Sequence, residues 1–512
     1  MLPILHKILL CFVFISVVQS YKVLIVFPGL SPSHFFLANS LGRALVKKGH
    51  EVTMVSPYED KQPLTGYKEV VLTDFLADDD ALEAADIDDM FKFENINLFS
   101  QVLFFNKFMT ESSKATLNHP NLQKLLESNE KFDVIILEQF KQEALHVLQC
   151  HYEAPLILLN TLGANVWINP YVGNPAPPSY IPDTFSQYSE KMDFWERAFN
   201  SILILFERVL LYFSIHQNQY EMAISKFPHC ANENFSNNIS LVFLNAHEST
   251  TQAVPLVPNM INIGGFHIGE PKDLPTDLKN ILDSAKEGVI YFSLGSNVKS
   301  SDINSDIKQA ILKSLGKLTH KVLWKYEDES LKPPKNVEIR KWLPQQDILA
   351  HPNVKLFITH GGLLSMTETV HYGVPVLVLP VLGDQKMNAA KAEHAGYGIK
   401  IPFSQITEER LTNALNKLLN DYKYLETARK LSTLSRDRPV KPMDLAIYWI
   451  EYIAKHKGAP HLRVAALDLT WYQYLLLDVI AFAVIVVGIA FTTIYVLCKK
   501  CFCKKIKKFK RD

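Results

Sequence analysis

The sequence predicts an α/β protein with two parallel sheets and a single C-terminal membrane helix. Short β-branched runs alternate with helical patterns in two separate series, which is typical of strands joined by helical crossovers. A Pro- and Gly-rich stretch at 255–275 separates the two series and has the composition of a linker. The run from Val479 to Cys498 carries no charge, and at about 1.5 Å per residue it is long enough to span a hydrocarbon core of about 30 Å.

The N-terminal end of the chain, residues 1–20, reads as a secretory signal peptide. Lys7 precedes an apolar run from Ile8 to Val18, and Ser20 offers a small residue at a cleavage site. The mature protein is therefore expected to begin at Tyr21 and to fold in a secretory compartment.

At the other end, the membrane helix is assigned to 475–498 and is followed by a basic tail at 499–512. Because positively charged flanks stay in the cytosol, the body of the chain is expected on the luminal side, as a single-pass type I protein. Lys508 and Lys510 resemble a dilysine-type signal for return to the endoplasmic reticulum. A basic tail that only attracts anionic lipid is the alternative.

Charge and cysteine content narrow the class of protein further. The 53 Lys and Arg balance the 53 Asp and Glu, so no nucleic-acid partner is implied. Outside the signal, anchor and tail only Cys150 and Cys230 remain, and in an oxidising lumen they allow one disulfide, which the sequence leaves open. Asn234 and Asn238 each begin a sequon for N-glycosylation, and whether both are used is also left open.

The first series, over 21–254, begins with the strand-like "KVLIVF", a helix that starts near His34, and "EVTMVS". Together they form one βαβ unit. "FDVIIL" (132–137) and "APLILLN" (154–160) read as further buried strands. The following stretch, 169–211, is rich in Pro, Tyr and Phe, a composition that suits an apolar pocket better than regular packing.

The second series, over 276–460, contains six strand-and-loop units: "GVIYFSLGS", "KVLWKY", "VEIRKWLP", "VKLFITHGG", "VPVLVLP" and "YGIKIP". Ligands of open parallel sheets bind at the carboxyl ends of the strands. Every polar candidate in this half of the chain lies at or just beyond such an end.

The stretch around Gly362 predicts an anion site, because a helix that begins there presents unpaired N–H groups and its positive dipole end. His360 adds a hydrogen-bond donor, and Ser296 follows another strand end with a second hydroxyl. A phosphate or diphosphate is the ligand that such groups suit.

Other strand ends supply the remaining parts of a nucleotide-sugar site. Trp342 offers a face on which a base can stack, a contact of about 1 to 3 kcal/mol, and Gln345 can read polar edges. Glu368 suits the paired hydroxyls of a ribose, and Asp384 with Gln385 suits the hydroxyls of a sugar.

The stretch "WLPQQDILAHPNVKLFITHGGLLSMTETVHYGVPVLVLPVLGDQ" closely resembles the donor-site signature of the UDP-glycosyltransferases, and the resemblance extends over essentially the whole chain. It implies the glycosyltransferase B fold, in which two Rossmann-like domains face each other, the first binding the acceptor and the second the UDP-sugar. The residues that it implies for the donor site are Trp342 for uracil, Gln345 and Glu368 for uridine, Ser296, His360 and Ser365 for the diphosphate at the Gly362 loop, and Asp384 with Gln385 for the sugar.

The same resemblance makes His34 the catalytic base, which removes a proton from the acceptor hydroxyl. Family members normally orient this base with an Asp, whereas Glu138 stands at the matching position here, and Asp133 is the alternative. A second departure is Leu364, which stands where many members place Asn in the diphosphate loop.

Competing interpretations are less well supported. Asp86 and Asp88 have the spacing of a metal-binding pair in metal-dependent glycosyltransferases, but their surroundings are acidic throughout, so a solvated face is favoured and no metal is expected. No GxGxxG follows the first strand and no GxSxG elbow occurs, which argues against dinucleotide oxidoreductases and α/β-hydrolases.

The resulting expectation is an endoplasmic reticulum membrane enzyme that transfers a hexose, with inversion, to hydroxyls of small lipophilic acceptors. UDP-glucose is the favoured donor and UDP-glucuronate the second choice. The UDP-sugar is a co-substrate and no cofactor is expected. The C-terminal anchor is expected to contact membrane lipid, and homo-oligomerisation is left open. The alternative is a catalytically silent luminal glycoprotein that binds a lipophilic ligand.

Overall fold

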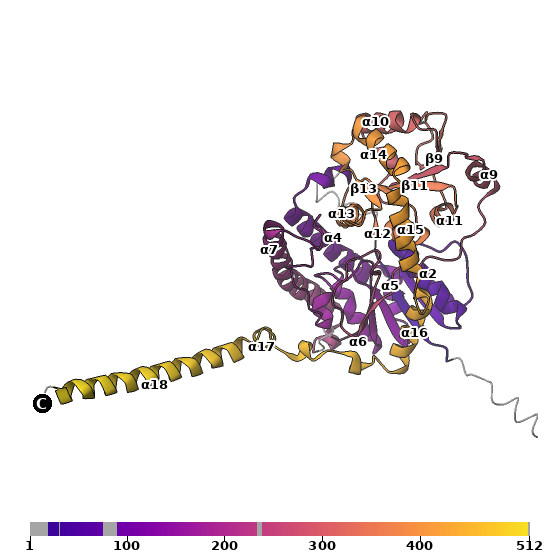
Figure 1. Ribbon diagram of the computed structural model, residues 1–512. Coiled ribbons are helices and arrows are strands. Elements are labelled where there is room, and N and C mark those ends of the chain that lie inside the picture. The colour runs from indigo at the N-terminus through magenta and orange to yellow at the C-terminus, as the bar shows by residue number, and fades with distance from the viewer. Residues whose placement is uncertain (1–18, 30, 75–89, 233–237, 510–512) are drawn as a thin grey trace, which may run out of the picture. The chain divides into compact units, whose positions relative to one another are not determined.

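A computed structural model of the chain describes residues 19–29, 31–74, 90–232 and 238–509 (Figure 1). The chain divides into two compact units, of which the first ends at Leu462 and the second begins at Arg463. The predicted signal peptide, the Asp86 and Asp88 pair and the Asn234 sequon lie outside the described residues.

The first unit contains two parallel sheets, as the sequence predicts. The first sheet has seven strands in the order β3-β2-β1-β4-β5-β6-β7. Strand order reverses between β1 and β4, which is where an open parallel sheet leaves a crevice for ligands. The strands are β1 (Lys22–Val26), β2 (Glu51–Ser56), β3 (Tyr67–Val71), β4 (Val134–Glu138), β5 (Leu156–Asn160), β6 (Ile239–Leu244) and β7 (Met260–Asn262).

The second sheet has six strands in the order β10-β9-β8-β11-β12-β13, and its order reverses between β8 and β11. The six strands are β8 (Val289–Ser293), β9 (Lys321–Lys325), β10 (Val337–Arg340), β11 (Val354–Thr359), β12 (Val376–Val378) and β13 (Gly398–Lys400). Each belongs to one of the six strand-and-loop units predicted from the sequence. Two Rossmann-like halves are therefore confirmed.

Helices cover both faces of each sheet. Those of the first half are α2 (Pro32–Lys47), α4 (Leu98–Asn118), α5 (Pro120–Leu126), α6 (Leu148–Tyr152), α7 (Phe194–Leu210) and α8 (Tyr220–Lys226). Those that follow are α9 (Thr276–Ser284), α10 (Ser305–Gly316), α11 (Gln345–Leu349), α12 (Leu363–Tyr372), α13 (Gln385–Ala395), α14 (Glu408–Asn420), α15 (Tyr422–Arg436) and α16 (Pro442–Lys455).

Two features differ from the predicted boundaries. β7 lies inside the stretch 255–275 that reads as a linker, and it pairs with β6 as the edge strand of the first sheet. Its three residues are too few to show a strand pattern among the prolines and glycines around them.

The second difference concerns α16, which the sequence assigns to the C-terminal domain over 276–460. Its apolar face packs instead into the core of the first sheet, against the side chains of β1, β4 and β6. An amphipathic pattern shows that a helix buries one face, but it does not say which sheet receives that face.

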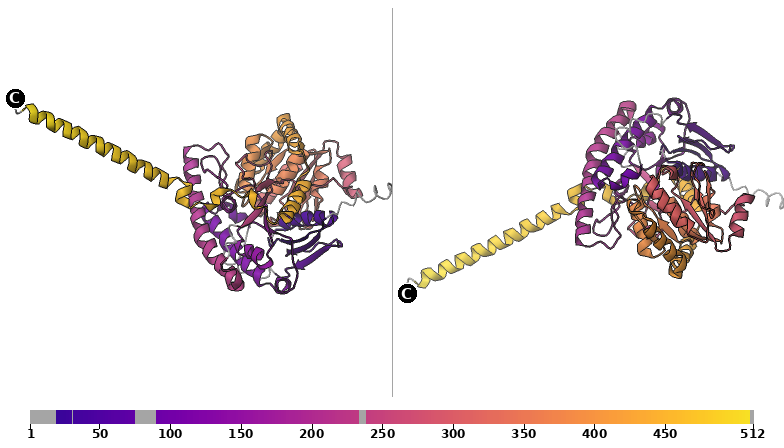
Figure 2. Two further views of the ribbon diagram at one scale, coloured as in Figure 1. Left: turned by 90° about the horizontal axis from the view of Figure 1, so that it is seen from below. Right: turned by 90° about the horizontal axis from the view of Figure 1, so that it is seen from above.

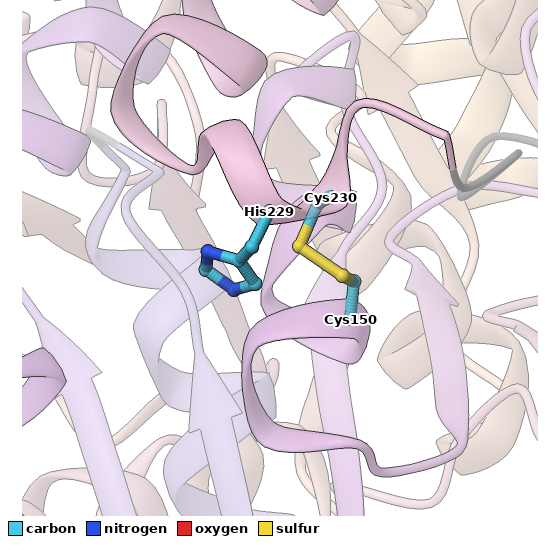
Figure 3. A group of neighbouring side chains, drawn as sticks. All are labelled: Cys150, His229 and Cys230. Atoms are coloured by element: carbon cyan, nitrogen blue, oxygen red, sulfur yellow. A yellow bond between two sulfur atoms is a disulfide. The ribbon is translucent and has the colours of Figure 1, made fainter.

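Cys150 and Cys230 form a disulfide between α6 and the short turn at Pro228–Cys230 (Figure 3). His229 lies beside the two sulfur atoms, so the three residues have the proximity of a metal site. Because the sulfurs are bonded to each other, neither offers a thiolate ligand. We therefore read this group as a structural crosslink over a separation of 80 residues.

The second unit consists of the short helix α17 (Trp471–Tyr474) and the long helix α18 (Leu477–Phe509). Its segment Leu477–Lys500 is long and apolar enough to cross a membrane, in agreement with the anchor predicted at 475–498. The helix continues into the basic tail. A second stretch, Phe194–Lys226, passes the same test of length and composition, although it belongs to the first unit.

Candidate active site

A cavity of about 2270 Å³ lies between the two halves of the first unit and is lined by both. The hydroxyl of Ser31, before α2, donates across it to Asn297 Oδ1 at 3.1 Å. All eleven site residues predicted from the sequence line this cavity. They are brought together because they follow strands that are neighbours in each sheet, so their carboxyl ends meet at one edge.

His34 lies in the first turn of α2, just after β1, and Glu138 is the last residue of the adjacent strand β4. The His34 Nδ1 hydrogen bonds with Glu138 Oε1. Glu138 Oε2 accepts a second hydrogen bond from the backbone N–H of Gly29, at 2.8 Å. The carboxylate is fully buried, whereas 21% of the His34 side chain remains exposed. Asp133, the alternative partner, instead accepts from the backbone N–H of Lys22 at the start of β1.

Gly29 explains how a glutamate fits where the family has an aspartate. A Cβ on residue 29 would lie 2.6 Å from Glu138 Oε2, closer than real Cβ contacts allow. The missing side chain provides the room that the additional methylene of Glu138 requires. Gly29 is visible in the sequence motif "FPGL". Its role as a space for the Glu138 side chain could not be predicted there, because Glu138 lies more than a hundred positions away.

Aromatic side chains form the wall of the cavity around His34. The ring of Phe140 meets the His34 ring edge-on at 5.5 Å between centroids. The other aromatic residues on this side come from α4, from the loop after β5 and from the Pro-rich stretch that follows it: Phe104, Phe105, Phe108, Trp167 and Phe185. Such a wall suits a lipophilic ligand whose polar group points to the imidazole.

On the other side of the cavity, Glu368 is the centre of a polar cluster. It is buried and accepts hydrogen bonds from Gln345 Nε2 at 2.6 Å and from Gln346 Nε2 at 2.9 Å. His267 Nε2 lies 3.3 Å from Glu368 Oε1, the oxygen that also accepts from Gln346. Gln345 also donates to the hydroxyl of Ser365, at 3.1 Å. Sequence reasoning missed Gln346 and His267. His267 was missed because it reaches the cluster from the segment after β7, which is distant in the chain.

His360 follows β11 and its ring is held between two glycines. A Cβ on Gly295 or on Gly362 would approach the ring to 2.6 or 2.7 Å. Burial, with a smaller contribution from the charge of Lys325, lowers the pKa of His360 to about 4. The imidazole is therefore neutral at physiological pH and acts as a hydrogen-bonding group rather than as a cation.

Lys325, at the end of β9, is a cationic side chain of the cavity that the sequence analysis did not select. Its Nζ donates to the backbone oxygen of Gly295 at 2.9 Å and to Glu327 Oε1 at 2.8 Å. Gly295 has φ +83°, a left-handed conformation that favours glycine. The loop that carries Ser296 is thus tied to the neighbouring strand by a lysine.

Asp384 and Gln385 stand at the start of α13. Asp384 accepts a hydrogen bond from Asn388 Nδ2 at 2.6 Å. Burial raises the pKa of Asp384, against the opposing effects of that hydrogen bond and of the nearby His34. The Gln385 side-chain oxygen accepts from the backbone N–H groups of Val381 and Leu382 at 2.8 and 3.0 Å, which leaves its amide nitrogen as the group that can serve a ligand.

Trp342 and Leu364 complete this side of the cavity. The Trp342 side chain is 73% exposed after β10, so its ring face is accessible for stacking. Leu364, the departure noted in the diphosphate loop, packs against the core cluster of the first half. Its side chain thus serves the contact between the halves and offers no hydrogen-bond donor to the cavity.

Comparisons with known proteins agree with this architecture. The family model described as UDP-glucoronosyl and UDP-glucosyl transferase matches residues 22–512. The chain is 37% identical to UDP-glycosyltransferase UGT5 of Dactylopius coccus, over 94% of this chain and 92% of that protein. It is 35% identical to human UDP-glucuronosyltransferase 1A8, over 95% of this chain and 93% of that protein.

Among solved structures, the glycosyltransferase VinC in complex with DTDP has a similar fold, with a TM-score of 0.58 and 15% identity over 85% of this chain and all of that one. At that identity the likeness concerns the fold, which is the two-domain glycosyltransferase B architecture. The family match and the two relatives span nearly the whole chain, including the half that carries the candidate donor site. The chain therefore belongs to the UDP-glucuronosyl and UDP-glucosyl transferase family and is a UDP-glycosyltransferase.

Proposed function

We propose that this enzyme transfers a hexose from a UDP-sugar, with UDP-glucose favoured, to a hydroxyl of small lipophilic acceptors, with inversion at the anomeric carbon. The observation that carries the proposal is the hydrogen-bonded pair of His34 and Glu138, which faces the Asp384 side of the same cavity. Aromatic residues surround the base on the acceptor side. A catalytically silent binding protein is not favoured, because the pair is complete.

The buried Glu138 carboxylate accepts the Nδ1 proton of His34, so Nε2 is left with a lone pair. Nε2 removes the proton of the acceptor hydroxyl as its oxygen attacks the anomeric carbon. The bond between that carbon and the β-phosphate oxygen breaks, and UDP leaves from the opposite face. The oxygen–carbon bond that forms therefore has the inverted configuration.

The donor half holds the nucleotide and accommodates the charge of departing UDP. Trp342 stacks on uracil, and Glu368 accepts hydrogen bonds from the ribose hydroxyls. Gln345 already donates to the Glu368 carboxylate, so the ribose and Gln345 share that carboxylate. The N-terminus of α12, Ser296 and neutral His360 donate to the diphosphate. Because these donors are all protein groups, we propose that no metal takes part.

The test is transfer by the full-length protein in microsomes, with UDP-glucose or UDP-glucuronate as donor and a panel of phenols as acceptors. We expect glucoside formation that is unchanged by EDTA, since the leaving group is stabilised by hydrogen bonds rather than by a cation. Product identified by mass and by anomeric configuration is the measurement. Transfer from UDP-glucuronate alone would overturn the donor assignment, and loss of activity in EDTA would overturn the metal-free site.

The donor assignments predict weaker nucleotide binding in two variants. Trp342→Ala removes the stacking face, worth about 1 to 3 kcal/mol. Glu368→Ala removes a charged hydrogen-bond acceptor, worth about 1.5 to 3 kcal/mol. Each should raise the KM for the UDP-sugar by about fivefold or more. Trp471→Ala, a similarly exposed tryptophan of the second unit, is the matched control and should leave that KM unchanged. Unchanged donor KM in both site variants would refute the assignment.

We also propose that the enzyme resides in the endoplasmic reticulum membrane with its two sheets in the lumen. A glycan at Asn238, which is exposed just before β6, reports on this location. It should stay sensitive to endoglycosidase H in the natural protein and become resistant when Lys508 and Lys510 are changed to Ser. The same change at Lys504 and Lys505 is the control. Resistant glycans on the unaltered protein would contradict retention but not the enzymatic role.

A further inference from the structure

His267 is a buried imidazole beside the candidate donor site, and no hydrogen bond of the fold uses its ring. No part of the side chain is exposed, and the residue belongs to the segment after β7 that borders the cavity. Within the described part of the chain, neither ring nitrogen has a hydrogen-bond partner. A buried polar group without a partner is destabilising, so this ring points to a role that packing does not explain.

The ring faces the carboxylate of Glu368. Its Nε2 lies 3.3 Å from Glu368 Oε1, just beyond the range of about 2.7 to 3.2 Å that is usual for an N–H···O bond. Two aromatic rings also meet the imidazole edge-on, that of Phe36 in α2 at 6.0 Å and that of Phe266 at 6.1 Å between centroids. Neither of these rings offers a lone pair, so the carboxylate is the group to which His267 can donate.

The backbone fixes the place of this ring against α12. Arg438, from the crossing between α15 and α16, donates to the backbone oxygen of Gly264 at 2.8 Å. A Cβ on Gly265 would lie 3.7 Å from Thr367 of α12, so the turn packs closely on that helix. The segment after β7 joins the two halves, and Figure 2 shows the indigo and magenta elements of the first sheet beside the orange elements of the second. His267 therefore lies at the junction of the halves.

In the present arrangement the protein itself covers Glu368. Gln345 donates to Oε2 at 2.6 Å, Gln346 donates to Oε1 at 2.9 Å, and only 5% of the Glu368 side chain is exposed. Ribose hydroxyls that donate to this carboxylate therefore displace one of the two amides. Gln346 shares Oε1 with His267, so its departure is the one that leaves a second protein donor at hand. A buried carboxylate that loses a donor is destabilised unless another donor replaces it.

We propose that His267 is a positioning residue for the nucleotide. Its Nε2–H donates to Glu368 Oε1 when the ribose takes the place of Gln346, and this bond keeps the carboxylate directed at the ribose. The long contact then shortens into a hydrogen bond, as polar contacts of such sites often do once the ligand is bound. The inference rests on the proposed role of Glu368 in the donor site. Recognition of the ribose hydroxyls then depends on a histidine that does not touch them.

The test measures how strongly the full-length protein in detergent prefers UDP to its 2′-deoxy and 3′-deoxy analogues. We define the ribose preference as the Kd of the weaker-binding analogue divided by the Kd of UDP, both from binding titrations of the same sample. As a ratio, this quantity does not depend on the fraction of the protein that is folded.

His267→Phe keeps a ring in place but removes the donor. It should weaken UDP binding at least about fivefold and lower the ribose preference at least about threefold, because Glu368 is then no longer held. In steady-state kinetics the loss should appear in the KM for the UDP-sugar more than in kcat, since the proton transfer at His34 is not affected directly.

His267→Gln tests whether donation is what the ring supplies. Its amide nitrogen has about the reach of Nε2 and should restore the ribose preference to within about twofold of the natural value. The matched control is His320→Phe, at a histidine of the second half outside the lining of the cavity. Its Nδ1 is likewise unpaired among the residues that the structure describes, and its replacement should change neither UDP affinity nor the ribose preference.

A double-mutant cycle separates positioning from direct contact. If His267 acts through Glu368, adding His267→Phe to Glu368→Ala should weaken UDP binding by no more than about twofold further. A direct contact of His267 with the nucleotide would instead make the two losses multiply.

Equal ribose preference in the natural protein and in His267→Phe would overturn the proposal. So would losses that multiply in the cycle, or a Gln variant that is no better than the Phe variant. In each of these cases the donor site still stands if Glu368→Ala alone lowers the ribose preference. An unchanged preference in Glu368→Ala would overturn the ribose role of Glu368, and with it both the donor site and this inference.

Discussion

Replacing His34 with Ala should lower kcat/KM for transfer to an aliphatic alcohol by about 10² to 10⁴-fold, the usual contribution of a positioned general base. The alcohol is too weak an acid to attack the anomeric carbon without losing its proton. UDP should still bind with unchanged affinity, because the nucleotide residues belong to the other half of the cavity. Initial rates and a direct binding titration with UDP measure the two quantities.

The control for this variant is His394→Ala, which removes an exposed histidine at the end of α13 and should leave activity unchanged. An acidic phenol should lose less activity than an alcohol in His34→Ala, since it is partly ionised without a base. If His34→Ala kept more than about a tenth of the natural activity towards the alcohol, the assignment of the base would be wrong.

Glu138→Gln is expected to lower kcat by about 10²-fold or more with little change in the KM for the UDP-sugar. The amide can still accept from Gly29 through its oxygen, but its nitrogen then faces His34 Nδ1 and requires a lone pair there. The imidazole proton moves to Nε2, so the ring presents a donor to the acceptor hydroxyl where the reaction needs a base. Steady-state kinetics in both substrates separates kcat from KM.

Glu138→Asp distinguishes this role from simple packing. Gln has nearly the shape of Glu, so a packing role predicts that Glu138→Gln is the milder change. A charge that fixes the tautomer of His34 predicts the opposite order, because Asp keeps the carboxylate despite the gap that it leaves beside Gly29. Activity of Glu138→Gln above that of Glu138→Asp would contradict the proposed role.

The donor half could be predicted well because its information is local. Ser296, His360 and Asp384 each follow a strand, and parallel pairing of β8, β11 and β12 brings these positions together without further assumptions. Trp342 follows β10 in the same sheet and lines the same cavity. The strand pattern and the sequence signature therefore predict which of these residues share the cavity, whereas their roles toward a donor stay a prediction.

Gln346 and Lys325 were missed although they lie beside predicted positions, whereas the other features that were missed depend on approach between distant segments. The role of Gly29 depends on its contact with Glu138, and the role of His267 depends on its contact with Glu368. The members of each pair lie more than a hundred residues apart in the chain. The destination of α16 and the burial of Glu207 on α7 are likewise decided by the partners that the fold supplies. A periodic pattern predicts that a face is buried or exposed on average, and Glu207 of α7 departs from it because Lys141 and Trp167 interact with its carboxylate inside the protein.

The return of α16 to the first sheet has a consequence for motion between the two halves. The backbone crosses from one half to the other twice, once after β7 and once between α15 and α16. Two crossings act as a double hinge, which permits the halves to rock about one axis and opposes twisting about others. Substrate exchange would then proceed by a clam-like opening along a single direction, and lengthening either crossing with glycines would loosen that constraint without touching the chemistry.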